Sequence, residues 1–226
     1  MPEVVINGPD GRIEARYHQS KIPKAPLAIL LHPHPEYGGT MNNKIVYALY
    51  RCFTDRGCSA IRFNFRGVGR SEGTFNNGEG ELHDAATVLD WLQVYTPSAG
   101  SYWVGGFSFG SWVGMQLLMR RPELSGFISV SPPANMYDFT FLAPCPVSGL
   151  ILQGDKDVIA PKDSVDDFVD NMAIQKGIQV EYRLIRGADH FFTNRISQLT
   201  NEVDTYLDQM LQPENTLLPR LAPRVV

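Results

Sequence analysis

Apolar and polar positions along the 226-residue chain change period at regular intervals. Short apolar runs alternate with longer stretches in which apolar residues recur every three or four positions. The first pattern is typical of buried strands and the second of amphipathic helices. Their alternation predicts parallel βαβ units, which form a sheet covered by helices on both faces.

The chain opens with a predicted β-hairpin, in which Val4–Ile6 and Ile13–Tyr17 flank the turn cluster NGPDG. Further strands are expected at 27–31, 59–65, 101–105, 127–130, 147–153 and 178–185, and helices at 44–56, 81–95, 111–120, 163–176 and 196–211. The expected fold is therefore α/β, a mostly parallel doubly wound sheet with an N-terminal antiparallel hairpin, in a single domain spanning residues 1–226.

The C-terminal tail, 212–226, contains three prolines and cannot form one helix. We expect it to be either a loose end or an arm docked on its own subunit or a neighbour. An arm docked on a neighbouring subunit would suit a homo-oligomer.

Composition narrows the classes of partner. The chain is 43% hydrophobic and 19% charged, with a net charge of −4 and no basic run. We therefore expect no nucleic-acid partner and no membrane partner. The first residues lack the pattern of a signal peptide, and no apolar run is long enough to cross a bilayer. Cys52, Cys58 and Cys145 have neither disulfide-like nor ligand-like spacing, so we expect inert thiols and a cytoplasmic location.

A G-x-S-x-G pattern surrounds Ser108 in SYWVGGFSFGSWVGMQLL, with a predicted strand before it and a helix after it. That context is typical of a nucleophile elbow, a sharp turn that presents a serine. Gly106 and Gly110 supply the small residues that the turn needs. The helix N-terminus beside Ser108 would favour a developing oxyanion. The alternative interpretation is a serine that caps an ordinary helix.

A serine nucleophile needs a base, and the base needs an orienting acid. His190 is the one histidine that follows Ser108 in the sequence, and it comes after the last predicted strand. Asp155 and Asp157, in LILQGDKDVIAP, follow another strand. Loops at the carboxyl ends of parallel strands meet at one edge of the sheet, where chemistry in such folds occurs. The alternatives are a surface histidine and aspartates with turn or capping roles.

Five segments in this order resemble the α/β-hydrolase superfamily: LLHPHPEYGGTMNNK, FNFRGVGRSEG, GGFSFGSW, ILQGDKDVIAP and GADHFF. Within it, the sequence is similar to small lidless bacterial hydrolases related to dienelactone hydrolases and short-chain carboxylesterases. The resemblance covers most of the chain and implies an α/β-hydrolase fold with no lid domain. It also implies that Asp157, the second aspartate of G-D-x-D, is the acid, with Asp155 as a turn residue and His190 as the base.

Two backbone N–H groups are expected to form an oxyanion hole. One belongs to Phe109, the residue after the nucleophile. The other should come from the loop after the first central strand, where much of the superfamily has His-Gly and this chain has HPHP at 32–35. Proline has no N–H to donate. The expected donor is therefore His34, with Glu36 or Tyr37 as the alternative.

Other patterns suggest different functions. His32-x-His34 could mark a metal site, but a catalytic zinc needs three convergent ligands and the remaining histidines are scattered. We expect His32 to orient its loop instead. RGVGRSEG is similar to a dinucleotide loop, but its third glycine comes one residue late for G-x-G-x-x-G. A hydrolase scaffold can also serve as a binding module, although such proteins usually lose a triad residue.

The sequence therefore predicts a serine hydrolase that cleaves small or short-acyl carboxylic esters without a metal or cofactor. Only 132–146 lies where many relatives insert a helical lid, and an open pocket suits a small substrate. Tyr137, Phe139 and Phe141 are candidates to line it, or are core or interface residues. Thioesters and lactones pass through the same intermediate, so a thioesterase or a dienelactone-like lactone hydrolase is the alternative.

Overall fold

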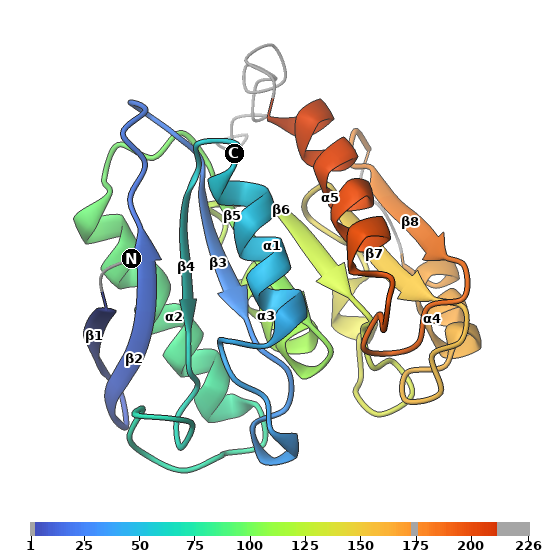
Figure 1. Cartoon of the computed structure of the whole chain (residues 1–226), viewed down its shortest axis with the longest axis horizontal. Helices are drawn as coiled ribbons and strands as arrows, with labels where there is room; N and C mark the ends of the chain where they lie inside the picture. The colour runs from blue at the N-terminus through green and yellow to red at the C-terminus, as the bar shows by residue number, and fades with distance from the viewer. Residues whose placement is uncertain (1–2, 173–175, 212–226) are drawn as a thin grey trace, which may run out of the picture.

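Eight strands form one sheet in the computed structural model of the chain, which describes residues 3–172 and 176–211 (Figure 1). The strands are β1 (Glu3–Gly8), β2 (Gly11–His18), β3 (Leu27–Leu31), β4 (Ser59–Phe63), β5 (Tyr102–Phe107), β6 (Leu124–Val130), β7 (Gly149–Gly154) and β8 (Val180–Ile185). Their order is β1-β2-β4-β3-β5-β6-β7-β8. β2 pairs antiparallel with both β1 and β4, and every other neighbouring pair is parallel.

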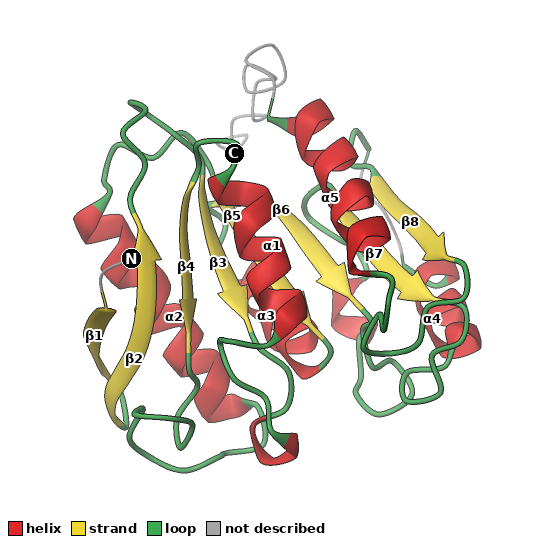
Figure 2. Cartoon of the chain, viewed as in Figure 1, coloured by secondary structure: helices red, strands yellow, loops and turns green. Residues whose placement is uncertain are grey.

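Helices cover both faces of this sheet (Figure 2). One face carries α1 (Lys44–Thr54) and α5 (Ile196–Met210), and the other carries α2 (Glu79–Tyr95), α3 (Phe109–Arg120) and α4 (Lys162–Asp170). Two short 3-10 helices, η1 (Pro35–Tyr37) and η2 (Thr140–Leu142), lie in loops. The predicted α/β fold, with its antiparallel hairpin and without a lid domain, is confirmed. None of the described helices is long and apolar enough to cross a membrane.

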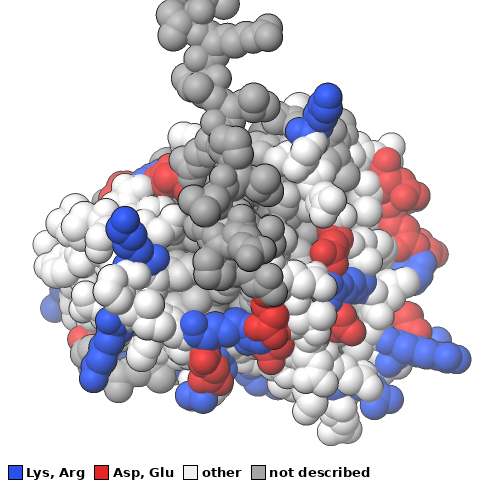
Figure 3. Space-filling view, turned by 90° about the horizontal axis from the view of Figure 1, so that it is seen from above, with Lys and Arg blue, Asp and Glu red and all other residues white. Residues whose placement is uncertain are grey.

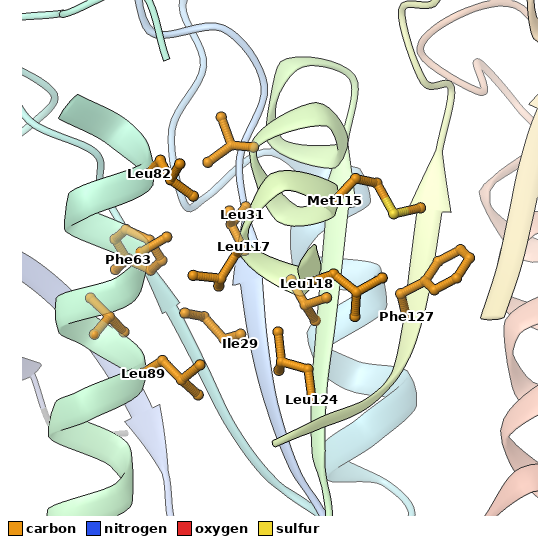
Figure 4. Close-up of a cluster of buried hydrophobic side chains, with 14 of the residues drawn as sticks. Ile29, Leu31, Phe63, Leu82, Leu89, Met115, Leu117, Leu118, Leu124 and Phe127 are labelled. Atoms are coloured by element: carbon orange, nitrogen blue, oxygen red, sulfur yellow. The ribbon is translucent and has the colours of Figure 1, made fainter. Parts of the chain in front are cut away.

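Central strands such as β3 are buried on both faces, which explains their unbroken apolar sequence. Side chains alternate along a strand, so Ile29 and Leu31 face α2 and α3 while Ala28 and Leu30 face α1 and α5. Figure 4 shows the first of these two layers, in which side chains of α2 and α3 meet those of the sheet: Leu82, Leu89, Leu117, Leu118 and Phe63.

Several element boundaries differ from the sequence prediction by two residues or more, and two of these differences have a local cause. The strand expected to reach Phe65 ends at Phe63, because the backbone N–H of Phe65 donates to the His32 ring rather than to a neighbouring strand. The helix expected over 163–176 ends at Asp170. There the amide side chain of Asn171 donates to the carbonyl of Asp167, which satisfies an acceptor of the last turn. The tail 212–226 lies outside the described residues.

The parallel strands all point their carboxyl ends toward the lower edge of the sheet in Figure 1. The loops 32–43, 64–78, 131–148, 155–161 and 186–195 therefore gather there. The opposite edge, seen in Figure 3, shows positive and negative side chains interspersed over the visible described surface. The lower edge is where ligand sites form in open α/β sheets.

One buried ion pair ties a loop of this edge to a helix. Arg66, after β4, donates to Asp84 of α2 from its Nε and Nη2 atoms at 3.0 and 2.8 Å, and from its backbone N–H at 2.9 Å. The Arg66 and Asp84 side chains are only 8% and 1% exposed. Removing one partner leaves a buried charge without its main counterion, which is costly.

We therefore expect Asp84→Ala to lower the free energy of unfolding by about 3–5 kcal/mol. The matched control is Asp55→Ala, which breaks the exposed pair between Arg51 and Asp55 on α1 and should cost less than about 1 kcal/mol. Urea unfolding followed by circular dichroism measures both values. If both variants lost a similar, small amount of unfolding free energy, the structural role of Asp84 would be contradicted.

Candidate active site

The backbone at Ser108 takes a conformation that side chains rarely adopt. It joins β5 directly to α3 with φ 54° and ψ −122°. Such a conformation costs of order 1–3 kcal/mol and persists only where the surroundings enforce it. Here the Ser108 N–H donates to the carbonyl of Val130 at 2.9 Å, and its own carbonyl accepts from the N–H and hydroxyl of Ser111. The turn therefore has the strained geometry of a nucleophile elbow.

Two glycines make room for this turn, as predicted. A Cβ added at Gly106 would lie 2.3 Å from the carbonyl oxygen of Gly110. One added at Gly110 would lie 2.5 Å from the carbonyl oxygens of both Leu31 and His32. The start of α3 thus packs directly on the end of β3. That contact places Ser108 and Phe109 beside the loop that begins at His32.

Ser108, His190 and Asp157 form one hydrogen-bonded chain. The Oγ of Ser108 lies 3.1 Å from the Nε2 of His190, and the Nδ1 of His190 lies 2.7 Å from the Oδ2 of Asp157. All three residues are buried, at 8%, 4% and 5% exposure. A carboxylate only accepts, so Nδ1 carries the proton and Nε2 is free to accept from the serine hydroxyl. This is the geometry of a general base held for proton removal.

The carboxylate of Asp157 is held on both of its oxygens. Oδ1 accepts from the backbone N–H groups of Ile159 and Ala160 at 2.9 and 2.8 Å, and Oδ2 accepts from the side chain of Gln153 at 3.2 Å. The amide of Gln153 also donates to the carbonyl of Ala160 at 2.7 Å. Sequence reasoning missed Gln153. The available signal was a polar residue inside the apolar run of β7, where it is fully buried.

Asp155 holds a different part of the site. Its Oδ1 accepts from the backbone N–H of Gly187 at 2.6 Å, in the loop that leads from β8 to His190. The structure therefore places Asp157 against the imidazole and Asp155 in a turn. This is the arrangement that the resemblance implied, although the catalytic roles themselves stay a prediction.

The two residues expected to supply the oxyanion donors contact each other through their side chains. The ring of His34 is 5.0 Å from the ring of Phe109. Among the described residues, neither backbone N–H has a hydrogen-bond acceptor. The alternative donors are occupied, because Glu36 N–H donates to the His34 ring and Tyr37 N–H donates to the His34 carbonyl. The free N–H groups of His34 and Phe109 therefore remain the candidates for an oxyanion hole.

His32 fixes the start of this loop. Its side chain is fully buried, with Nδ1 2.6 Å from the carbonyl of Pro33 and Nε2 3.0 Å from the backbone N–H of Phe65. Nδ1 therefore donates and Nε2 accepts, so both ring nitrogens are used. A metal shared by His32 and His34 does not fit, because the Nδ1 of His34 also accepts from Glu36.

The loop RGVGRSEG is a pinned turn rather than the start of a helix. Gly67, Gly69 and Gly73 all have positive φ. The hydroxyl of Ser71 donates to the carbonyl of Asn64 at 2.7 Å and accepts from the N–H of Glu14 at 2.9 Å, which ties the turn to β2. A dinucleotide loop needs a helix directly after its glycines, whereas α2 starts only at Glu79.

Aromatic rings pack around the ring of Phe109. The rings of Phe75, Trp112 and Tyr137 each lie 5.8 Å from it, and Trp112 stacks on Tyr137 at 4.4 Å. Of the predicted lining candidates, Tyr137 belongs to this group, whereas Phe139 is buried and packs on Phe168 at 4.7 Å. Phe141 stacks on Phe139.

The lowered pKa of His32 should make the free energy of unfolding depend on pH. Burial lowers this pKa to about 4, whereas an unfolded histidine titrates near 6.5. The unfolded chain therefore binds the proton first. The folded state therefore has its full stability, as far as His32 is concerned, above about pH 6.5 and loses stability as the pH falls toward 4.

Between pH 7 and pH 5, we expect the wild type to lose about 2 kcal/mol of unfolding free energy that His32→Gln does not lose. The glutamine amide offers one donor and one acceptor but does not titrate. Urea unfolding at both pH values measures the difference. An equal pH dependence of the two proteins would contradict a buried neutral His32.

The chain is similar to one protein-family model and to several solved structures of α/β hydrolases. The family model described as X-Pro dipeptidyl-peptidase (S15 family) matches residues 12–211. The chain is 55% identical to ATU1826 of Agrobacterium tumefaciens, described as an α/β hydrolase of unknown function, with a TM-score of 0.90 over 93% of this chain and 96% of that one. It is 36% identical to an α/β serine hydrolase homologue of Coxiella burnetii, with a TM-score of 0.83 over 91% and 97% of the two chains.

A third solved structure bears on the absence of a lid. XC6422 of Xanthomonas campestris, described as an α/β serine hydrolase without a lid, is 28% identical, with a TM-score of 0.85 over 94% of this chain and 95% of that one. The match to the S15 model spans most of the chain, and the sheet, the elbow at Ser108 and these relatives agree with it. The chain belongs to the S15 family and to the α/β serine hydrolases, and its described residues form no lid domain.

Proposed function

We propose that the protein hydrolyses small or short-acyl carboxylic esters through an acyl-enzyme on Ser108. The hydrogen-bonded chain from Ser108 through His190 to Asp157, next to two free backbone N–H groups, is the observation that carries this proposal. A serine with an oriented base and nearby oxyanion donors is equipped for acyl transfer.

Each step has a group in position. His190 takes the proton of the Ser108 hydroxyl through Nε2 as Oγ attacks the carbonyl carbon, and Asp157 stabilises the imidazolium that forms. The N–H groups of His34 and Phe109 stabilise the oxyanion. His190 then returns the proton to the departing alkoxide, which leaves as the alcohol. Water, deprotonated by the same histidine, then attacks the carbonyl carbon of the acyl-enzyme. The bond from this carbon to Oγ breaks, His190 returns the proton to Oγ, and the carboxylic acid is released.

The short connection between β6 and β7 supports a small substrate. It contains only the three-residue helix η2 between Val130 and Gly149. Nothing the size of a helical lid covers Ser108 from this segment. An open site removes less of a long acyl chain from water than a closed one does.

Other carbonyl substrates share the same intermediate. A thioester or a lactone, as in a dienelactone-like hydrolase, is the second candidate, and the S15 description adds peptide amides to the panel. A non-catalytic binding module is disfavoured by the intact hydrogen-bonded triad. Initial rates on matched ethyl esters, ethanethiol esters, lactones and dipeptidyl anilides would rank these classes.

We also propose a reducing, cytoplasmic location and a small-molecule substrate rather than a nucleic-acid or membrane partner. Cys52, Cys58 and Cys145 are free thiols and are all buried. Burial raises the pKa of Cys58 to about 11, so it is a poor nucleophile at neutral pH.

Ser108 should be the single residue modified by a fluorophosphonate probe. We expect one adduct on the peptide that contains it, because the Nε2 of His190 lies 3.1 Å from its Oγ and can activate it. Ser108→Ala should lose the adduct and lower kcat by about 10⁴-fold or more, with its melting temperature unchanged. Ser197→Ala, an exposed serine on α5, serves as the labelling control and should keep the adduct. Labelling of folded Ser108→Ala, or turnover near that of the wild type, would refute the nucleophile assignment.

The two aspartates should differ sharply. Asp157→Asn places an amide against His190 and favours the wrong imidazole tautomer, so kcat should fall roughly 10³–10⁴-fold. Asp155→Asn keeps an oxygen for the Gly187 N–H and should cost less than about tenfold. Steady-state kinetics on an ethyl ester measures both. Equal losses, or a larger loss in Asp155→Asn, would assign the acid to the wrong residue.

A further inference from the structure

A groove of about 360 Å³ lies between the segment 134–143 and helix α4, at the same edge of the sheet as Ser108. Its volume is at the small end of the range for small-molecule sites. In Figure 1, α4 lies at the lower right, on the side to which β7 and β8 point. The residues that line it are Ala134, Tyr137, Asp138, Phe139, Thr140, Leu142, Ala143, Ser164, Asp167, Phe168, Asn171 and Met172.

Tyr137 connects this groove to the reaction centre. Its ring lies 5.8 Å from that of Phe109, whose backbone follows Ser108 directly, and it also lines the groove. Trp112 holds Tyr137 there, because it stacks on the ring and donates from Nε1 to the carbonyl of Asp138 at 3.0 Å. The same segment is tied to the loop that carries Asp157, because the side chain of Asn135 donates to the carbonyl of Ile159 at 3.0 Å.

The position of the groove relative to His190 selects which part of an ester can enter it. His190 must protonate the leaving alcohol, so the alcohol lies on the side of the imidazole. The rings that flank the imidazole are Phe107 and Phe191, at 5.1 and 5.3 Å. Neither of these rings lines the groove, which contacts Phe109 through Tyr137 instead. The groove therefore suits the acyl group rather than the alcohol.

The lining is apolar inside and negatively charged at the surface. Phe139, Leu142 and Met172 are buried, and Phe168 packs against Phe139. Asp138 and Asp167 also line the groove and are exposed, and no Lys or Arg of the described chain pairs with either of them. Apolar walls favour a hydrocarbon chain, whereas the unpaired carboxylates repel a negatively charged one.

A smaller hollow does not compete for this role. It has a volume of about 180 Å³ and lies at the opposite edge of the sheet, among residues 19–25, Ser59 and 96–99. None of the loops that carry Ser108, Asp157 or His190 contributes to it.

We propose that the groove between 134–143 and α4 binds the acyl group of the substrate, that Tyr137 forms its entrance, and that it selects neutral, apolar acyl chains. This inference rests on the proposed esterase function, since it concerns the acyl part of the same reaction. It makes acyl length and acyl charge, rather than the alcohol, the determinants of specificity.

Isomeric esters separate the acyl side from the alcohol side. Ethyl hexanoate and hexyl acetate have the same atoms, and kcat/KM for each is measured against ethyl acetate by pH-stat. We expect ethyl hexanoate to exceed hexyl acetate by at least tenfold, since each buried methylene contributes up to about fourfold. Thr140→Trp, which fills the groove from an exposed position, should lower this ratio to near one. Thr205→Trp, exposed on α5, should leave it unchanged. A ratio near one in the wild type, or no change in Thr140→Trp, would overturn the proposal.

Charge gives an independent test in case Thr140→Trp does not fold. Monoethyl adipate has an acyl chain of the same length as hexanoate but ends in a carboxylate. We expect its kcat/KM to be at least tenfold below that of ethyl hexanoate. Asp167→Lys should reduce this gap at least threefold, and Asp163→Lys, exposed on the same helix but outside the groove, should not. An equal effect of the two variants would contradict the assignment.

Labelling rates distinguish failure of the groove from failure of the proposed function. Phosphonofluoridates that carry an ethyl or a hexyl group on phosphorus modify Ser108 without turnover, and this alkyl group takes the place of the acyl chain. Faster labelling by the hexyl probe, lost in Thr140→Trp, supports the groove even if no ester is hydrolysed. Equal rates in both proteins refute the groove alone. No labelling by either probe refutes the serine hydrolase itself, and the acyl assignment falls with it.

Discussion

The close contact between the start of α3 and the end of β3 is the constraint on which the site depends. Ser108 can hold its positive φ only because Gly106 and Gly110 leave room for the backbone on either side. At Gly110, the carbonyl oxygens of Leu31 and His32 occupy the space that a side chain would fill. The same contact that strains the nucleophile thus also delivers the oxyanion loop to it. One packing contact therefore positions both the nucleophile and the oxyanion donors.

Buried polar groups hold each loop at this edge. The imidazole of His32 joins the oxyanion loop to Phe65, the carboxylate of Asp84 holds Arg66, and Asp155 holds the loop that carries His190. Gln153 and two backbone N–H groups orient the carboxylate of Asp157. Because these hydrogen bonds are already formed inside the protein, the donors and the base do not need to reorganise when charge develops on the substrate. A lidless site has no closing segment to supply that order, so the loops must have it in advance.

The absence of a lid also changes what binds the acyl group. In this fold the β6–β7 connection is short, and η2 together with α4 forms the wall of the groove directly. Trp112 links that wall to α3 through a stack on Tyr137 and a hydrogen bond to the carbonyl of Asp138. The helix that begins at the nucleophile therefore also positions the groove. Substrate choice and catalysis are coupled through one element of secondary structure.

The sequence by itself determined the architecture and the identity of the groups that meet at the site. Strand and helix periods predicted the βαβ order, because each element must bury an apolar face whatever its neighbours are. The glycines around Ser108 and the order of serine, aspartate and histidine along the chain indicated Ser108, His190 and one of Asp155 and Asp157, and the family resemblance then implied Asp157, which the structure places against the imidazole. The two prolines at 33 and 35 left His34 as the expected donor, since they have no N–H.

Only the tertiary structure decided which groups remain free and which are occupied. Glu36 and Tyr37 already use their N–H groups, His32 uses both ring nitrogens, and Gln153 holds Asp157. Each of these contacts either joins segments distant in the chain or lies in a turn whose form depends on such contacts. The end of β4 at Phe63 was missed for the same reason, since Phe65 donates to the distant His32 ring. Periodicity records which face of an element is buried, but a hydrogen bond to a remote loop leaves no period in the sequence.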